Sequence, residues 1–244
     1  MGWENCIFDL YGTLVDIRTD ERAPVLWQQM AEEFARRGAA CPATVLQDRY
    51  HALIRQAEGA PGLRQDAHEA HPEIDIEAVF RELLREQRLP ASPVAVRTLA
   101  LQFRRWSTRF LRLYDGAEQL LRELRTAGKG VYLLSNAQGV FTRWELEQLG
   151  LTDAFDGICL SSEAGCKKPD RRFFRLLLER YDIDPAQAVM IGNDGVCDIG
   201  GGRALGMATI YVHSAISPRE LLPAADHILD PLDLKKVRQI LLEA

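Results

Sequence analysis

The sequence predicts an α/β fold in which a parallel β-sheet carries an inserted, all-helical segment. Short apolar runs alternate with helical patterns after residue 113, which is typical of a parallel sheet with helices on both faces. An apolar run in residues 3–9 predicts a first strand of the same sheet, and helical patterns fill residues 16–113. We therefore expect one α/β core built from residues 1–15 and 114–244, with a helical domain at residues 16–113.

The spacing of apolar residues predicts the helices of the inserted segment. Leu26, Met30 and Phe34 recur about one helical turn apart, and so do Leu46 and Tyr50. No convincing strand pattern occurs in this part of the chain. Two further helices are therefore expected, at residues 76–87 and 93–113.

In the second half of the chain, glycines and polar pairs separate the apolar runs from the helical patterns. This alternation favours strands at residues 130–134, 157–160, 188–191, 209–212 and 227–229, helices at 117–127, 140–149 and 171–181, a glycine-rich helix start at 200–202 and a C-terminal amphipathic helix.

The composition excludes several classes of protein. The 244 residues carry a net charge of −5, so we expect neither a nucleic-acid-binding surface nor a surface for anionic membranes. No uncharged apolar run reaches membrane-spanning length, and residues 1–5 lack the pattern of a signal peptide. The five cysteines, an odd number without a CxxC pair, favour reduced thiols. We expect a cytoplasmic protein, either a monomer or a homodimer.

Polar residues follow the first two predicted strands of the core. Asp9 comes directly after the first strand, Gly12 permits a sharp turn, and Thr13 adds a hydroxyl. Ser135 and Asn136 follow the strand at 130–134 in the same way. Because the carboxyl ends of parallel strands meet at one edge of a sheet, we expect these side chains to lie close together.

Two later segments add a cation and more carboxylates. Lys168 precedes a proline just before a helix, while Asn193, Asp194 and Asp198 surround a glycine turn after the strand at 188–191. Together with Asp9 these groups can hold a divalent cation and a small anionic substrate.

Four segments, Phe8–Thr13, Leu134–Asn136, Lys168–Asp170 and Gly192–Asp198, resemble the four motifs of the haloacid dehalogenase superfamily, in the order found in that family. The resemblance covers essentially the whole chain, and the helical segment matches the family's C1-type cap. It implies a Rossmann-like core, a mobile cap and a hydrolase that forms a covalent intermediate on an aspartate.

The resemblance also implies roles for individual residues. Asp9 matches the nucleophile, and Lys168 matches the residue that neutralises charge on the substrate. Thr13 and Ser135 match the groups that bind the transferring group, and Asn136 belongs to the same motif. The implied ligands of Mg²⁺ are Asp9, the carbonyl of Tyr11, Asp194 and Asp198, with Asn193 competing with Asp194 for one position.

Tyr11 departs from the pattern of the family's phosphatases, which usually have an aspartate there as general acid and base. A phenol with a pKa of about 10 is a poor base near neutrality. A tyrosine at this place resembles the 2-haloacid dehalogenases, whose leaving halide needs no proton.

The fourth motif favours the other chemistry. A dehalogenase needs no metal, and Asp194 and Asp198 would repel its carboxylate substrate in the absence of one. We therefore expect a Mg²⁺-dependent phosphatase of a small phosphorylated metabolite. A 2-haloacid dehalogenase and a weakly active regulatory binding protein remain the alternatives. Arg18 and Arg22, close behind the first motif, are candidates for binding the substrate.

Overall fold

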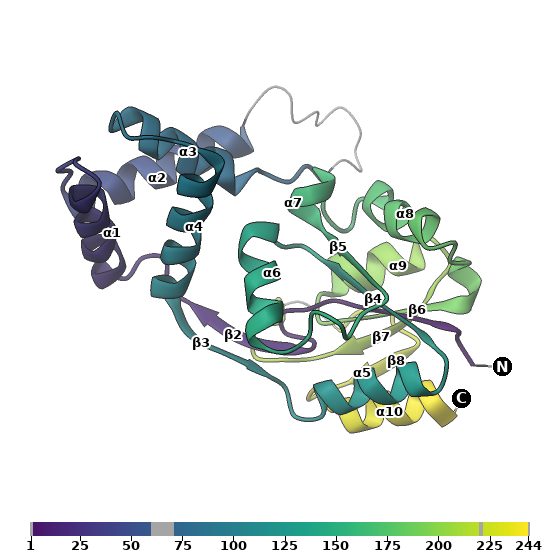
Figure 1. Cartoon of the computed structure of the whole chain (residues 1–244). Helices are drawn as coiled ribbons and strands as arrows, with labels where there is room; N and C mark the ends of the chain where they lie inside the picture. Colours follow the sequence, from purple (N-terminus) through teal and green to yellow (C-terminus); the bar gives the residue numbers. More distant parts are fainter. Residues whose placement is uncertain (1, 60–70, 220–221, 244) are drawn as a thin grey trace.

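The computed structural model describes residues 2–59, 71–219 and 222–243. Its centre is a six-stranded parallel sheet in the order β5-β4-β1-β6-β7-β8 (Figure 1). The N-terminal strand lies in the middle and pairs with β4 on one side and β6 on the other, so the first strand and the second half of the chain form one sheet. The strands are β1 (Asn5–Phe8), β4 (Gly130–Ser135), β5 (Gly157–Leu160), β6 (Ala188–Gly192), β7 (Ala208–Val212) and β8 (His227–Leu229).

Helices cover both faces of this sheet. Successive residues of a strand point to opposite faces, so Ile7 and Phe8 enter two different apolar clusters. Phe8 packs in a cluster that includes leucines of α5 and α10, and Ile7 packs in one that includes Phe173 and Phe174 of α8. The helices of the core are α5 (Ala117–Thr126), α6 (Gly139–Gln148), α7 (Ser161–Ala164), α8 (Arg171–Arg180), α9 (Gly201–Arg203) and α10 (Leu234–Glu243). The α/β architecture is therefore confirmed.

The inserted helices build a second hydrophobic cluster, which Phe141 of α6 also joins. Aromatic rings form its centre: the ring centroids of Tyr50 and Phe103 lie 5.0 Å apart, and those of Phe80 and Phe103 lie 5.2 Å apart. Figure 1 shows these helices grouped beside the sheet and its helices. They are α1 (Pro24–Arg36), α2 (Ala43–Glu58), α3 (Ile76–Glu86) and α4 (Pro93–Ser107).

The expectation that residues 16–113 contain no strand was wrong. Strands β2 (Val15–Thr19) and β3 (Thr108–Leu113) pair antiparallel where the chain leaves the core and returns to it. The predicted helix at 93–113 therefore ends at Ser107. Its continuation contains several arginines, which we interpreted as helical, but Arg109 and Arg112 form cross-strand ion pairs with Asp20 and Asp16. Arg112 lies opposite Asp16 in the register of the two strands, and Asp20 follows directly after β2.

The glycine-rich stretch after β6 also differs from the prediction. A turn of π-helix at Gly195–Gly200 precedes the short α9, so helical structure begins earlier than residue 200. The carboxylate of Asp194 caps this turn.

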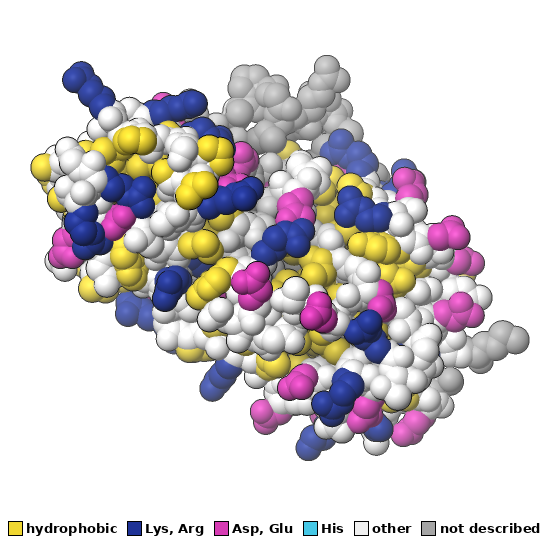
Figure 2. Space-filling model, viewed as in Figure 1, with side chains coloured by type: hydrophobic (Ala, Val, Ile, Leu, Met, Phe, Trp, Pro, Cys, Tyr) yellow, Lys and Arg dark blue, Asp and Glu magenta, His cyan; other side chains and the backbone are white. Residues whose placement is uncertain are grey.

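The described surface mixes charges of both signs. On the face shown in Figure 2, basic and acidic side chains are interspersed over the core and the inserted helices. None of the helices in the described ranges is long and apolar enough to cross a membrane.

Candidate active site

Asp9 lies directly after the central strand β1, at the carboxyl edge of the sheet. Its backbone N–H donates to the carbonyl of Ile191 on β6, at 2.9 Å, so the sheet hydrogen bonding fixes its backbone. Gly12 follows with a φ of +84°, a conformation that favours glycine. A Cβ atom there would lie 2.4 Å from Nδ2 of Asn193. Glycine therefore lets the loop after Asp9 approach the loop after β6.

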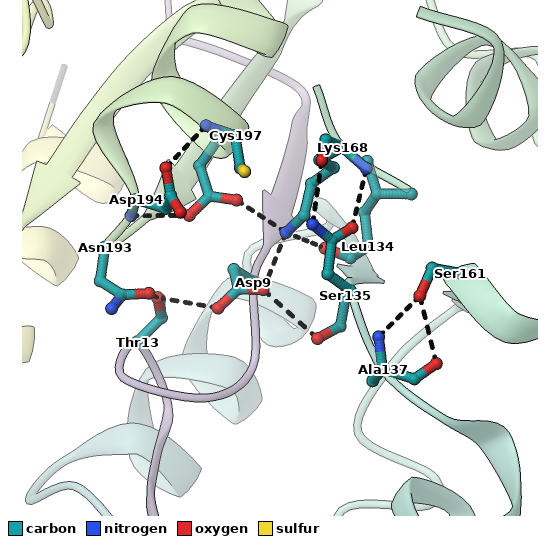
Figure 3. A network of polar contacts seen from close by, with 12 residues as sticks. Asp9, Thr13, Leu134, Ser135, Ala137, Ser161, Lys168, Asn193, Asp194 and Cys197 are labelled. Atoms are coloured by element: carbon teal, nitrogen blue, oxygen red, sulfur yellow. Dashed lines mark hydrogen bonds and ion pairs between the residues drawn. The ribbon is translucent and has the colours of Figure 1, made fainter. Parts of the chain in front are cut away.

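Three side chains from distant parts of the sequence converge on the carboxylate of Asp9 (Figure 3). Nζ of Lys168 donates to Oδ1 at 2.8 Å, and the hydroxyl of Ser135 donates to the same oxygen at 3.3 Å. The hydroxyl of Thr13 donates to Oδ2 at 3.4 Å. Asp9 is 7% exposed, so the site is almost closed from solvent in this conformation.

Lys168 is the buried cation of the site. Nζ also donates to the carbonyl of Leu134 at 2.7 Å and forms an ion pair with Oδ1 of Asp198 at 2.7 Å. Burial acts to lower the pKa of Lys168, but the carboxylates of Asp198 and Asp9 outweigh it and raise the pKa above its ordinary value. Lys168 therefore stays charged.

Asn136 holds the backbone of Lys168. Its Oδ1 accepts from the N–H of Lys168 at 2.7 Å, and its Nδ2 donates to the carbonyl of Lys168 at 3.0 Å. Both polar ends of the amide are thus engaged with one residue. The structure places Asn136 as a positioning residue for the cation, in addition to its place beside Ser135.

Asp198 is the second buried carboxylate. Oδ1 pairs with Lys168, and Oδ2 accepts from the backbone N–H of Asp194 at 3.0 Å. A Cβ atom on Gly192 would lie 2.2 Å from Oδ2, so glycine makes room for this side chain. Burial raises the pKa of Asp198 to about 7, Lys168 opposes the shift, and the charge of Asp9 adds to it.

This shift predicts a pH dependence of stability in Mg²⁺-free buffer. Between about pH 4 and pH 7 the folded protein keeps the proton of Asp198 while the unfolded chain has released it. The free energy of unfolding should therefore fall as the pH rises through this window. Urea unfolding at a series of pH values measures the slope, and Asp198→Asn should remove this component. An unchanged slope in the variant would contradict the assignment.

Asn193 and Asp194, which competed for one position, point in different directions. Oδ1 of Asn193 accepts from Thr13 at 3.5 Å, so this amide faces Asp9. Oδ1 of Asp194 accepts from the backbone N–H groups of Val196 and Cys197, at 2.9 and 2.7 Å. Asp194 therefore caps the following helical turn, and Asn193 is the residue that presents its oxygen to the site.

The donor set suits a hard divalent cation. No group of three or more His, Cys, Asp or Glu side chains among the described residues has the arrangement of a metal site. Asp9 and Asp198 provide two carboxylates beside the amide oxygen of Asn193, and the carbonyl of Tyr11 belongs to the same loop as Asp9. Mg²⁺ binds oxygen ligands and usually keeps several waters, so a set of this size and chemistry fits it.

The side chain of Tyr11 contacts a buried group that we did not predict. Its hydroxyl donates to Oε2 of Glu145 on α6 and lies 2.9 Å from Oγ1 of Thr142. Oε1 of Glu145 accepts from Nε of Arg104, on α4, at 2.6 Å. The guanidinium also lies over the rings of Tyr11 and Phe141, with its Cζ atom 5.9 and 5.2 Å from their centroids. These contacts join the inserted helices to the core.

Burial raises the pKa of Tyr11, and the negative charge of Glu145 raises it further. The phenol therefore stays protonated, with its hydroxyl hydrogen-bonded to Glu145. In the sequence, Arg104 lies in an arginine-rich helical pattern and Glu145 lies in another predicted helix. No sequence signal indicates that these two residues, 41 positions apart, form an ion pair.

Removal of Arg104 should destabilise the protein strongly. The Glu145 side chain is fully buried, so Arg104→Met leaves its carboxylate without a cation. A buried ion pair that loses one partner costs about 3–5 kcal/mol, and urea unfolding at neutral pH measures the loss. Arg105→Met is the matched control, because Arg105 is exposed and lies over the ring of Trp144. Equal losses of unfolding free energy in the two variants would show that the buried ion pair of Arg104 and Glu145 stabilises the protein no more than the exposed Arg105 does.

A cavity of about 390 Å³, here called the boundary cavity, lies between the core loops and the inserted helices. Tyr11, Asn136 and Ala137 line it from the core, and Arg104 lines it from α4. The candidate substrate residues Arg18 and Arg22 are exposed and do not line it. The structure therefore does not bring these two arginines to the site, and it places Arg104 beside it instead.

Comparison with known proteins identifies the family. The model of the family described as haloacid dehalogenase-like hydrolase matches residues 3–206. A phosphoserine phosphatase of Thermus thermophilus is 35% identical over 161 residues, which are 66% of this chain and 63% of that protein. The haloacid dehalogenase-like hydrolase domain-containing protein 3 of Mus musculus is 34% identical over 132 residues, or 49% of this chain and 51% of that protein. The chain thus spans between half and two thirds of these relatives.

Solved structures show the same fold. A HAD phosphatase from Thermococcus onnurineus superposes with a TM-score of 0.62 at 19% identity, covering 98% of both chains. An L-2-haloacid dehalogenase superposes with a TM-score of 0.58 at 20% identity, covering both chains completely. At this level of identity the likeness concerns the fold alone. On the match of the family model to most of its length, the chain belongs to the haloacid dehalogenase-like hydrolases.

Proposed function

We propose that the protein is a Mg²⁺-dependent phosphatase of a small phosphorylated metabolite, with Asp9 as the nucleophile. The observation that carries the proposal is the cluster around the Asp9 carboxylate. Lys168, Ser135 and Thr13 are the hydrogen-bond donors there, and Asp198 and Asn193 bring oxygen ligands to the same place. The name of the relative from Thermus thermophilus, phosphoserine phosphatase, supports phosphoryl chemistry.

In the proposed reaction a carboxylate oxygen of Asp9 attacks phosphorus, the P–O bond to the leaving group breaks, and the oxygen that leaves takes its proton from water. Lys168, Ser135 and Thr13 would donate to the phosphoryl oxygens as charge develops on them. Water then hydrolyses the aspartyl phosphate and restores Asp9. Asn136 contributes by holding Lys168.

Asp9, Asp198, Asn193 and the carbonyl of Tyr11 would hold Mg²⁺. The ion would offset the negative charge that Asp9, Asp198 and the phosphate bring together, and it would polarise a phosphoryl oxygen. Asp194 would act indirectly, because its backbone N–H orients Asp198 and its carboxylate caps the helical turn.

We further propose that residues 16–113 form a cap that closes over Asp9 and excludes water during the reaction. The hydrophobic cluster formed mainly by these helices supports their movement as a unit, with Phe141 of α6 as the point where the cluster contacts the core. The two-stranded ribbon of β2 and β3, where the chain crosses between the two parts, is the proposed hinge.

The test is turnover of a generic aryl phosphate with and without Mg²⁺. The proposal predicts hydrolysis that EDTA abolishes and that added Mg²⁺ restores. Activity that persists in EDTA would refute the metal requirement. No turnover of any phosphomonoester would refute the phosphatase.

A 2-haloacid dehalogenase is the second candidate, and the direction of Tyr11 favours it. The hydroxyl is hydrogen-bonded to Glu145, and halide release from carbon needs no acid at this position. This candidate predicts metal-independent halide release from a short 2-haloalkanoate, and no release in that assay would remove it.

Placing a carboxylate at position 11, where the family's phosphatases usually have an aspartate, distinguishes the phosphatase from the dehalogenase. Because an aspartate there would face the buried Glu145, the variant should be made as Tyr11→Asp together with Glu145→Gln. A positioned acid and base contributes about 10²–10⁴-fold in rate, so a phosphatase site should gain on the order of 10²-fold in kcat for an alkyl phosphate. Glu145→Gln alone is the control. No gain in a folded double variant would count against phosphoryl chemistry.

A further inference from the structure

A carboxylate from the inserted segment is fixed beside the core loops of the site. Residues 71–73 dock on the loop that leads to Lys168: the N–H of Lys167 donates to the carbonyl of His71 at 2.8 Å, and the N–H of Glu73 donates to the carbonyl of Gly165 at 3.2 Å. The Glu73 carboxylate accepts from the hydroxyl of Ser161 at 2.7 Å. That hydroxyl accepts from the N–H of Ala137 at 2.8 Å, in the loop after Ser135. Glu73 is therefore held at a defined place next to the phosphoryl site.

Negative charge dominates the boundary cavity. Glu73 and Glu21 both line it, and neither carboxylate lies within ion-pair distance of a cation among the described residues. Arg104 is the one basic residue of the described lining, and its Nε is bonded to Glu145 behind the wall. Glu21 acts electrostatically on Arg104, whereas Glu73 has no ion pair with a cation in the part of the chain that the structure describes.

The other walls of the cavity suit a cation as well. Rings of Tyr11, Tyr50 and Phe141 line it, and aromatic faces attract positive charge. The remaining lining is mixed: Ile54 and Ile74 are apolar, and Gln138 and Thr142 are polar but carry no charge. The Glu73 carboxylate accepts from the N–H of Ile74 at 3.0 Å and from Ser161, and both donors are neutral, so its charge is available to pair with a positive group.

We propose that the alcohol part of the substrate carries an ammonium group that binds to Glu73. This inference rests on the phosphatase function proposed above. With the phosphate at Asp9, the alcohol part extends into the boundary cavity, which adjoins Asn136 and Ala137. A second anionic group there would meet Glu73 and Glu21, and a neutral group would leave the Glu73 charge uncompensated. An ammonium group satisfies both the carboxylate and the aromatic walls.

Two pairs of phosphomonoesters test the preference, because the members of each pair differ only in an amino or a hydroxyl group. One pair is O-phosphoethanolamine and 2-hydroxyethyl phosphate, and the other is O-phosphoserine and 3-phosphoglycerate. An ionic hydrogen bond in a shielded site corresponds to about 10- to 100-fold, so kcat/KM should favour the amino member of each pair by that factor. The measurement uses the whole chain with Mg²⁺.

Variants assign the preference to Glu73. Glu73→Gln keeps the shape and an acceptor oxygen but removes the charge, so the amino-to-hydroxyl ratio should fall to about one. Glu73→Asp keeps the charge on a shorter side chain and should retain part of the ratio. Glu32→Gln, an exposed glutamate of α1, is the matched control and should keep the full ratio. Thermal unfolding of each variant shows whether it is folded.

The outcomes distinguish failure of the ammonium site from failure of the proposed phosphatase function. Turnover of an aryl phosphate with equal rates within each pair, or with a preference for the hydroxyl member, would overturn the ammonium site and leave the phosphatase standing. A preference that survives Glu73→Gln would overturn the role of Glu73. An absence of turnover for every phosphomonoester would remove both proposals.

Discussion

Asp9→Asn should abolish turnover of an aryl phosphate, with a loss in kcat of at least about 10³-fold. An amide oxygen is a poor nucleophile, and the neutral side chain also withdraws one of the two carboxylates that pair with Lys168. The substitution keeps the size of the side chain, so the backbone N–H bond to Ile191 on β6 should remain. Steady-state kinetics measures the loss, with the free energy of unfolding measured beside it.

Asp194→Asn is the matched control for this prediction. It also replaces a carboxylate with an amide, but at a side chain that accepts hydrogen bonds from two backbone N–H groups and faces away from Asp9. It should weaken the cap of the helical turn by about 1 kcal/mol and affect activity far less than Asp9→Asn. A substantial residual activity in Asp9→Asn would show that another residue attacks the substrate.

Lys168→Met should reduce both stability and activity. The variant leaves the carboxylates of Asp9 and Asp198 facing each other in a buried site without their cation. Removing one partner of a buried ion pair costs about 3–5 kcal/mol, and loss of a charged donor to the transition state lowers kcat by about 10²–10³-fold. Urea unfolding in EDTA and kinetics with Mg²⁺ measure the two effects separately.

Two further variants test the reason for this loss. Lys167→Met changes the neighbouring lysine, which forms no ion pair with a described residue, and it should change stability by less than about 1 kcal/mol. Lys168→Met combined with Asp198→Asn removes one of the two opposed carboxylates and should regain part of the lost stability. If the double variant is as unstable as the sum of the single ones, repulsion between Asp9 and Asp198 is not the cause.

The order of strands and helices could be predicted because the apolar periods of the core are regular. The apolar residues at 6–8 and 188–191 form adjacent central strands, and Asp9 stands at the end of the first of them. Parallel strands end at one edge, so the meeting of Asp9 and Ser135 followed from topology, whereas Lys168 comes from the loop between α7 and α8. The strands β2 and β3 were missed because the arginine-rich sequence of β3 continues the pattern of α4 without a break signal.

The directions of side chains could not be predicted in the same way. Tyr11 turns toward Glu145 because a buried carboxylate and Arg104 lie there, at positions 134 and 93 residues further along the chain. Asp194 turns away from the site because the N–H groups of the π-helical turn compete for its carboxylate. Both outcomes depend on contacts that only the folded chain creates.

The destination of solvent oxygen tests most directly the central claim that water attacks phosphorus and not the carboxyl carbon of Asp9. The protein is given an aryl phosphate and Mg²⁺ in H₂¹⁸O for a single turnover, and both the released phosphate and the peptide that contains Asp9 are analysed by mass spectrometry. Water that attacks phosphorus in an aspartyl phosphate places ¹⁸O in the phosphate and none in Asp9, which is the result we expect. Incorporation of ¹⁸O into the Asp9 carboxylate would mean attack on the carboxyl carbon, as in an ester formed by displacement of a halide, and would contradict the account.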